Sequence, residues 1–292
     1  MQEVQDPQRS PDAGRPAAPW FSVATFNVHA GVDGWGRPFD VVAACRAVDA
    51  DVLVLEETWT PSSGPGLAGE VARSLGYSVF EHALAGGRRA APDPAADDRW
   101  MRSFDWRGES HAIFLDSERP FGERVTGSSR YRDAEPGCWG LAVLSRLPVR
   151  ATETIDLGRL RRDRARRAAL VARIEVAGDA VTVVGTHMSH ITYGAPTQFV
   201  RLRRRIAARA PTGPVVVLGD MNLWGPPVAA FFPGWRRALR RRTWPAWRPH
   251  SQVDHVLVSE HLDVVHAEVL APAGSDHLPV RVRLAVRRRG GG

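Results

Sequence analysis

Short apolar stretches recur along the chain from about residue 20 to residue 286, and their length and period predict strands more often than helices. Continuous apolar runs such as DVLVL at residues 51–55 are typical of strands buried on both faces. Helical spacing of apolar positions predicts helices at residues 39–48, 67–75 and 198–210. Strands are expected at residues 21–28, 51–55, 77–80, 112–115, 141–144, 168–176, 180–186, 215–218, 253–258, 264–270 and 279–286.

The order of these elements indicates the fold class. Strands outnumber helices, and several follow one another directly, which fits two packed mixed sheets with helices outside better than a repeating strand–helix–strand unit. Residues 84–109 are rich in Ala, Gly, Pro, Asp and Arg, so we expect a long, partly mobile loop there. We expect one domain over residues 20–286, with a disordered lead at 1–19 and a loose tail at 287–292.

The overall composition is that of an ordinary globular protein, with 43% hydrophobic and 24% charged residues. The net charge of +7 favours polyanionic partners such as nucleic acid, anionic lipid or phosphorylated small molecules. However, the chain contains no lysine, and Arg, Ala, Gly and Pro are all abundant. This pattern indicates a codon bias toward GC-rich triplets, so the charge adds little weight to a polyanionic partner.

Sequence features that would direct the chain to a membrane or a secretory route are missing. No apolar run reaches the length of about 18 residues that a membrane span needs. The polar, proline-containing N-terminus lacks a basic region followed by an apolar one. Two cysteines, Cys45 and Cys138, do not form a disulfide framework. We therefore expect a cytoplasmic protein.

Polar residues stand at the ends of six predicted strands. Side chains at the ends of rigid buried strands can converge on one mouth. A carboxylate or imidazole on an apolar strand costs several kcal/mol unless it is paired or binds a metal. Six strands that all end in such residues are hard to explain as exposed polar positions without a function. The residues are Asn27, Glu56 and Glu57, His187 and His190, Asp220 and Asn222, Asp254, and Asp276 with His277.

The residue types in this set favour a divalent metal. Carboxylate and amide oxygens suit Mg²⁺ or Mn²⁺, and the spacing of a helical zinc site is missing. Asn27 and Asn222 are the only two asparagines of the chain, and both stand at these strand ends. Oxygen ligands together with histidines indicate phosphoryl chemistry, in which a metal neutralises developing charge while His and Asp carry protons.

Six motifs in a fixed order carry a family resemblance: TFNVH, LEETW, GTHMSH, GDMN, QVDHVLVS and SDHLPV. Each motif alone is a weak signal, but the ordered set resembles the endonuclease/exonuclease/phosphatase superfamily, which has the fold of pancreatic deoxyribonuclease. The resemblance extends from about residue 21 to residue 284. It implies an α/β fold, a four-layer sandwich of two packed mixed β-sheets flanked by helices, with the active site at one end of the sandwich.

The resemblance also implies which residues hold the metal. Glu57 would be the principal ligand of Mg²⁺ or Mn²⁺, with Asn27 beside it, and Asp276 would complete the coordination shell. The Gln that usually precedes this metal-binding Glu is replaced by Glu56. That substitution either adds negative charge near the metal or faces the edge of the core and pairs with an arginine.

The implied catalytic residues are His187, Asp220, Asn222, Asp254 and His277. His277, oriented by Asp254, would handle protons at the phosphate. Asp220 and Asn222 would position or activate the attacking water, and would contact the phosphate or a second metal. His187 would hydrogen-bond the phosphate or assist the leaving group. Whether the His277–Asp254 pair or Asp220 acts as the base stays open.

Two further residues are candidates for substrate binding. Arg167 ends an arginine-rich run at residues 159–167 and directly precedes a strand, so it is the member of that run most expected to face the site. The rest of the run is expected to be a solvated loop. His190 follows His187 closely, although a structural or rim role is the commoner outcome for such a histidine. His29 is expected to be a packing or rim residue.

The expected function is hydrolysis of a phosphoester by a metal-activated water, with a nuclease-type phosphodiesterase as the first choice. The alternatives are a phospholipid (sphingomyelinase-like) or sugar-phosphate phosphodiesterase or phosphatase. A lipid enzyme would need an apolar lip, for which Trp100, Trp106 and Trp224 are candidates. A catalytically silent phosphate-binding module is the alternative of another class. The expected partner is a phosphoester substrate, with DNA as one candidate, whereas membrane lipid is not indicated and the chain is expected to be a monomer.

Overall fold

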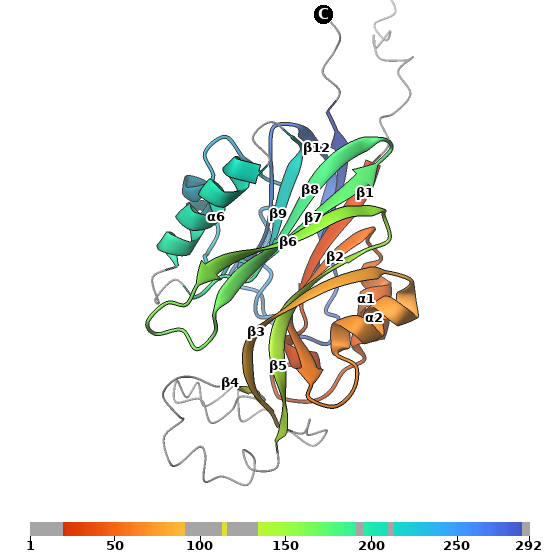
Figure 1. Ribbon diagram of the computed structural model, residues 1–292, viewed down its shortest axis with the longest axis vertical. Helices are drawn as coiled ribbons and strands as arrows, with labels where there is room; N and C mark the ends of the chain where they lie inside the picture. The colour runs from red at the N-terminus through yellow and green to blue at the C-terminus, as the bar shows by residue number, and fades with distance from the viewer. Residues whose placement is uncertain (1–19, 91–112, 116–133, 191–194, 210–212, 288–292) are drawn as a thin grey trace, which may run out of the picture.

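Two β-sheets lie face to face with helices over their outer faces in this computed structural model (Figure 1). The predicted α/β sandwich of two mixed sheets is therefore confirmed. The structure describes residues 20–90, 113–115, 134–190, 195–209 and 213–287. The expected lead, most of the expected loop at 84–109 and nearly all of the expected tail lie outside these residues.

The first sheet has seven strands. Strands β1 and β2 are parallel neighbours, and every other pair in this sheet is antiparallel. In spatial order the strands are β12 (Leu262–Val269), β13 (Val280–Val286), β1 (Trp20–Asn27), β2 (Val52–Pro61), β5 (Glu135–Ser145), β3 (Ser78–Arg89) and β4 (Ile113–Leu115).

The second sheet has six strands, again with one parallel pair, β8 and β9, among antiparallel ones. In spatial order the strands are β10 (Arg236–Arg237), β11 (Asp254–Val258), β9 (Val215–Asp220), β8 (Asp179–Thr186), β7 (Arg167–Val176) and β6 (Val149–Gly158). Because β2 and β9 are buried on both faces, their sequences contain the continuous apolar runs VLVL and VVVL rather than alternating ones.

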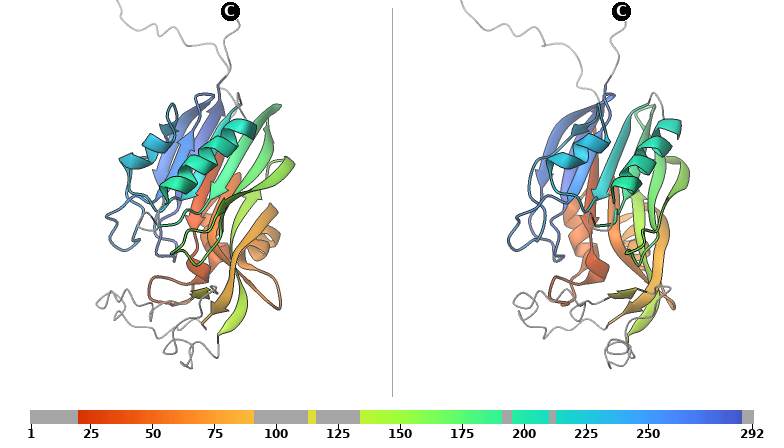
Figure 2. Two further views of the ribbon diagram at one scale, coloured as in Figure 1. Left: turned by 60° about the vertical axis from the view of Figure 1, so that its left-hand side comes forward. Right: turned by 90° about the vertical axis from the view of Figure 1, so that its left-hand side faces the viewer.

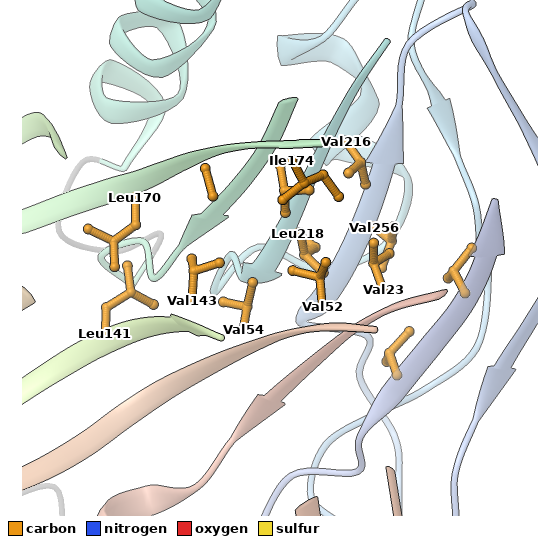
Figure 3. Packing of buried hydrophobic residues seen from close by; sticks show 14 of the residues in the cluster. Val23, Val52, Val54, Leu141, Val143, Leu170, Ile174, Val216, Leu218 and Val256 are labelled. Carbon is orange, nitrogen blue, oxygen red and sulfur yellow. The ribbon is translucent and has the colours of Figure 1, made fainter. Parts of the chain in front are cut away.

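The main core lies between the sheets, where aliphatic side chains from both inner faces interlock (Figure 3). Successive side chains of a strand point to opposite faces. In β2, Val52 and Val54 enter this central core, whereas Leu53 and Leu55 enter a second core on the helix side. Two rigid sheets are thereby held in fixed register, and this register determines where their strand ends meet.

The outer layers are short helices, seen on opposite sides of the sandwich in Figures 1 and 2. Helices α1 (Val41–Val48) and α2 (Leu67–Leu75) pack on the first sheet, and α6 (Pro196–Arg209) packs on the second. Asp40 caps α1 by accepting a hydrogen bond of 2.8 Å from the backbone N–H of Ala43. Of the helices in the described ranges, none is both long and apolar enough to cross a membrane.

Several elements differ from the sequence-based expectation. Strand β3 continues to Arg89, where it pairs with Glu135 of β5, so the first part of the expected loop at 84–109 is strand. Strand β6 was not expected, because half of its residues are exposed and its apolar signal is weak. The strand β10 and the 3-10 helices η1 (His29–Gly31) and η3 (Pro226–Phe231) were also not expected. Both cysteines are free.

Candidate active site

The inward-facing positions of the central strands become polar at one end of the sandwich. In β9 the inward positions are Val216, Leu218 and then Asp220. In β11 they are Val256 and Val258, with Asp254 two residues earlier, directly opposite Asp220 in the antiparallel register. The same period of two that builds the apolar core therefore directs both carboxylates into the space between the sheets.

Strands β1 and β8 follow the same rule. Inward positions of β1 end at Asn27, which is 1% exposed. The inward positions Val181 and Val183 of β8 lead to His187, directly beyond the strand. Between them Gly185 lets the sheets approach closely, because a Cβ there would lie 2.8 Å from the side chain of Val54.

Glu57 reaches the site through a break in the alternation. A β-bulge lies between Glu56 and Thr58 of β2, and Glu57 has a positive φ of 54°. Such a conformation is uncommon for a residue with a side chain and often marks a functional position. Glu56 keeps the inward orientation and is fully buried, accepting a 2.5 Å hydrogen bond from the Thr25 hydroxyl. Of the two alternatives expected for Glu56, pairing with an arginine does not occur among the described residues, where the partner of its carboxylate is Thr25.

The first cluster of the site consists of Glu57, His187 and Asp220, each of which offers one ligand atom within 4.8 Å of the others. The Nε2 atom of His187 lies 3.4 Å from Oδ2 of Asp220 and 3.9 Å from Oε1 of Glu57. Asn27 ties the carboxylates together, since its Nδ2 lies 3.0 Å from Glu57 Oε1 and 3.2 Å from Asp220 Oδ2. The side-chain oxygen Oδ1 of Asn27 accepts a hydrogen bond from the backbone N–H of His29.

Asn222 holds the other side of this cluster. It adopts a positive φ of 48°, two residues after Asp220, and its backbone N–H donates to Oδ1 of that aspartate. Its Nδ2 donates to the carbonyl of Met188 at 3.1 Å and lies 3.2 Å from Nε2 of His187. Asn222 therefore fixes the position of the imidazole relative to Asp220.

The second cluster is Asp220, Asp254 and His277. Nδ1 of His277 lies 3.0 Å from Oδ2 of Asp254, and its Nε2 lies 3.9 Å from Oδ2 of Asp220. The Asp254 carboxylate therefore orients the imidazole, with Nε2 directed toward the shared carboxylate. Asp220 is the residue that joins the two clusters.

Asp276 belongs to neither cluster. Its Oδ2 accepts a 3.2 Å hydrogen bond from the Trp244 indole, and its Oδ1 lies 3.7 Å from Nδ1 of His29. The neighbouring Ser275 hydroxyl donates to the carbonyl of Asn27 at 2.6 Å. These contacts fasten the segment before β13 to the end of β1. Asp276 therefore supports the position of the first cluster without belonging to it.

Burial and neighbouring charges set the protonation of this site. Burial, together with the charges of Asp254 and Glu57, raises the pKa of Asp220 to about 7, against the opposing effect of His277. Burial lowers the pKa of His187 far below its ordinary value, and the charge of Arg167 adds to this. Burial also opposes a charge on His277, but Asp254 and Asp276 outweigh it and raise the pKa of that imidazole well above its usual range.

A cavity of about 200 Å³ adjoins the first cluster at Glu57. The other residues that line it are His29, Trp139, Arg164 and, from β4, Ile113 and Leu115. His29, expected at the rim or in packing, is therefore a wall residue of this cavity. Its positive φ of 42° in η1 turns the chain directly beyond Asn27.

The two predicted substrate-binding residues lie at different depths. Arg167 is only 7% exposed, and its Nε donates to Asp163 at 2.8 Å. Its guanidinium lies over the ring of Trp139, 5.0 Å from the centroid, and that ring lies 5.1 Å from the imidazole of His187. Arg167 therefore stands behind the cavity wall. His190 is half-buried, and burial lowers its pKa.

The first cluster fits a divalent cation. Two carboxylates, an imidazole and an amide converge there, and Glu57 and Asp220 lie together at the cluster with only one imidazole between them. Oxygen-rich donor sets of this kind suit Mg²⁺ or Mn²⁺. The residues that would hold the ion are Glu57, Asp220, His187 and Asn27. Among the described residues these fit the ion better than Asp276, which belongs to neither cluster.

The two-sheet sandwich with carboxylates and imidazoles gathered at one end agrees with the family match, which makes the chain a phosphoester hydrolase. The chain belongs to the Endonuclease/Exonuclease/phosphatase family, which matches residues 24–277. A search of curated proteins found no match.

Solved structures share the fold at low sequence identity. An endonuclease/exonuclease/phosphatase from Beutenbergia cavernae DSM 12333 is 20% identical with a TM-score of 0.56, covering 92% of this chain and 72% of its own. The human Nocturnin catalytic domain with bound sulfate anion is 17% identical with a TM-score of 0.62, covering 92% and 94%. A mannosyl-6-phosphatase from Bacteroides thetaiotaomicron VPI-5482 is 15% identical with a TM-score of 0.59, covering 91% and 99%.

Proposed function

We propose that this hydrolase is a divalent-metal-dependent phosphodiesterase of the nuclease type. The observation that carries the proposal is the convergence of two clusters on one buried carboxylate, Asp220, beside a cavity that Glu57 of the first cluster lines. Glu57 and Asp220 would hold Mg²⁺ or Mn²⁺, with Asn27 and His187 beside them and Asp276 supporting the site. A bound metal of this kind supplies charge neutralisation and lowers the pKa of a coordinated water.

The charge of each side chain indicates its role in binding the phosphate and transferring protons. His277, held as a cation by Asp254, would bind the phosphate and deliver a proton to the leaving oxygen. Asn222 would hold the neutral His187 in place beside the phosphate. Asp220 would accept a proton from the attacking water, because His277 could act as the base only in its neutral form. The predicted roles of Asn27 and Glu57 in metal binding are retained in this scheme, whereas Asp276, predicted to complete the coordination shell, supports the site through its contacts with Trp244 and His29.

Hydrolysis of a model diester tests the reaction class directly. We expect the purified chain to hydrolyse bis-p-nitrophenyl phosphate with Mg²⁺ or Mn²⁺, to lose this activity with a chelator, and to lose it in the His277→Ala variant. Double-stranded and single-stranded DNA serve as the polymeric substrates. Wild type and variant that are equally inert on every substrate would instead favour the phosphate-binding module.

Metal binding has a readout that does not depend on activity. A ligand that binds only the folded state stabilises it, by about 2.7 kcal/mol at a hundred times its dissociation constant. We therefore expect Mg²⁺ or Mn²⁺ to raise the melting temperature of the wild type and not of Glu57→Gln. The matched control is Glu260→Gln, an exposed carboxylate at the opposite end of the sandwich, beside the start of β9. An equal metal response in both variants would remove Glu57 from the ligand set.

A phospholipid or sugar-phosphate ester is the second candidate substrate. Trp224 is 57% exposed and stands two residues after Asn222, so it could insert into a lipid interface beside the site. The small cavity would also admit a phosphorylated sugar, and a mannosyl-6-phosphatase is among the proteins of similar fold. Higher activity on vesicles than on DNA, lost in Trp224→Ala, would favour the lipid. The expected monomeric state and cytoplasmic location stay predictions.

A further inference from the structure

A row of arginines extends from the cavity onto the outer surface of the second sheet. It begins with the loop between β6 and β7, which is firmly held. Asp163 of this loop forms the buried ion pair with Arg167 and accepts a hydrogen bond from the Ser189 hydroxyl. The backbone N–H of Arg166 donates to the carbonyl of Leu84 at 3.1 Å. The loop therefore presents Arg164 at the cavity wall from a fixed position.

The row continues from this loop to α6. Arg166 binds Asp156 near the end of β6, with Nε 3.0 Å from Oδ1. The charge of Arg201 acts on the same aspartate, and its Nη1 donates to the carbonyl of Leu157 at 2.7 Å. The α6 helix is thus joined to the end of β6 directly beside the loop, as Figure 1 shows. The basic side chains of the loop and of the helix form one surface.

On α6 the row reaches a shallow hollow of about 560 Å³. Arg201, Arg204 and Arg205 line it, and their spacing of three and four residues places them on one face of the helix. Two acidic residues act on this face, and each is already bound by another arginine: Asp156 by Arg166, and Glu153 by Arg209, whose Nε lies 2.8 Å away. The hollow therefore keeps a concentrated positive charge.

The surface around the hollow favours a nucleic acid over a membrane. Binding to an anionic lipid surface uses protruding apolar side chains beside the basic ones. The exposed large hydrophobic side chains among the described residues are Trp20, Val79, Trp224 and Val265, and none of them lies on α6 or the β6–β7 loop. A groove of arginines without apolar anchors is the kind of surface that follows a phosphate backbone.

We propose that Arg164, Arg166, Arg201, Arg204 and Arg205, here called the arginine track, bind the phosphate backbone of a nucleic-acid substrate beyond the phosphate that is cleaved. The proposal rests on the proposed nuclease function, because it takes the cavity as the place of cleavage. A polymer that enters the cavity must lead its neighbouring phosphates across the adjacent surface. A small phosphorylated sugar would have no contact with α6.

The matched pair of variants is Arg204→Ala/Arg205→Ala against Arg46→Ala/Arg73→Ala. Each removes two positive charges from exposed helical positions, and the control residues lie on α1 and α2 in the opposite outer layer. The comparison therefore separates a local track from the general arginine content of the chain. Both pairs are made in the full chain carrying His277→Ala, so that DNA is bound in the presence of Mg²⁺ without being cleaved.

Fluorescence anisotropy with a labelled DNA duplex measures the dissociation constant over a series of salt concentrations. Each lost phosphate contact reduces the slope of log K against log salt by about 0.9, so the track variant should lose about 2 from the slope and about tenfold in affinity at low salt. The control variant should match the background. With the catalytic His277 restored, the track variant should show a raised KM for DNA.

Three outcomes would overturn the track. In the first, the track and control variants both bind DNA as tightly as the background protein. In the second, both variants lose the same affinity for DNA. In the third, the track variant loses binding to phosphatidylserine vesicles while it binds DNA normally. Each can occur while the wild type still hydrolyses bis-p-nitrophenyl phosphate, in which case the proposed function stands without the track. Failure of the wild type to hydrolyse that diester would refute the proposed function instead, whatever the anisotropy shows.

Discussion

The two histidines of the site, His187 and His277, are equally inaccessible to solvent but differ in charge. Their Nε2 atoms lie 3.4 Å and 3.9 Å from the same Asp220 oxygen, and both side chains are almost fully buried. Even so, the pKa of His187 is lowered far below its ordinary value and that of His277 is raised well above it. Burial disfavours the cation at both positions, so burial cannot be the cause of the difference.

The neighbours of each ring account for it. His277 has two carboxylates beside it, those of Asp254 and Asp276, which stabilise the cation. His187 also lies within 4 Å of two carboxylates, but among the described residues it has no hydrogen-bonded carboxylate partner such as Asp254 is for His277. Behind the adjacent tryptophan ring, the guanidinium of Arg167 repels a positive charge on His187. The two walls of one site therefore hold one cationic and one neutral imidazole, and we expect them to respond differently to substitution.

The largest effect should follow from removing the cationic histidine or the carboxylate that holds it. We expect His277→Asn and Asp254→Asn each to lower kcat on bis-p-nitrophenyl phosphate by about 10³-fold, within the range for loss of a proton-transferring group. Because the two act as one unit, the double variant should be scarcely worse than either single one. The measurement is steady-state kinetics of the three variants with saturating metal.

The control for this prediction is His266→Asn, an exposed histidine on β12 paired with Glu268. It should keep activity within a few fold of wild type. Losses that simply add in the double variant would show that Asp254 and His277 act independently.

A second prediction concerns the charge behind His187. Asp163 and Arg167 form a buried ion pair, and removing one partner of such a pair destabilises a protein by roughly 3 kcal/mol or more, because the other charge stays buried alone. We expect Asp163→Asn to lower the free energy of unfolding by about that amount at neutral pH. Urea unfolding followed by fluorescence measures it.

The pH dependence of this effect has a definite sign. Burial raises the pKa of Asp163, but the charge and hydrogen bonds of Arg167 outweigh it, so the folded pKa lies below the ordinary 3.8. The stabilisation is therefore complete above about 3.8 and is lost as pH falls through the folded pKa. The difference between wild type and Asp163→Asn should be constant from neutral pH to about pH 5 and should shrink at about pH 3. A difference that grows in acid would contradict the ion pair.

The apolar pattern predicted most of the sandwich, because buried strands and amphipathic helices carry a strong periodic signal. The expected helix at 67–75 coincides with α2, and the DVLVL run falls within β2. Strand β6 gave no such signal, since it forms the edge of its sheet and exposes residues such as Thr152 and Glu153. The extension of β3 to Arg89 depends on pairing with β5, which local sequence does not encode.

The members of the site could be named from the sequence, but their arrangement could not. Polar residues at strand ends predicted convergence, and the structure brings eight of them to one end of the sandwich: Asn27, Glu57, His187, Asp220, Asn222, Asp254, Asp276 and His277. The bulge that turns Glu57 into the site is a backbone feature with no clear local signal. Likewise, the position of Arg167 behind Trp139 depends on contacts between distant segments.

The smallest expected effect sharpens the comparison of the two histidines. A glutamine amide can donate and accept hydrogen bonds as a neutral imidazole does, but it cannot carry a proton as a cation. At His187, where Asn222 fixes a neutral ring, we therefore expect His187→Gln to lower kcat by only about tenfold, or about 1.4 kcal/mol. His277→Gln should resemble His277→Asn, with a loss of about 10³-fold. Equal losses for glutamine at the two positions would mean that the charge difference has no part in catalysis, and that only the position of each ring matters.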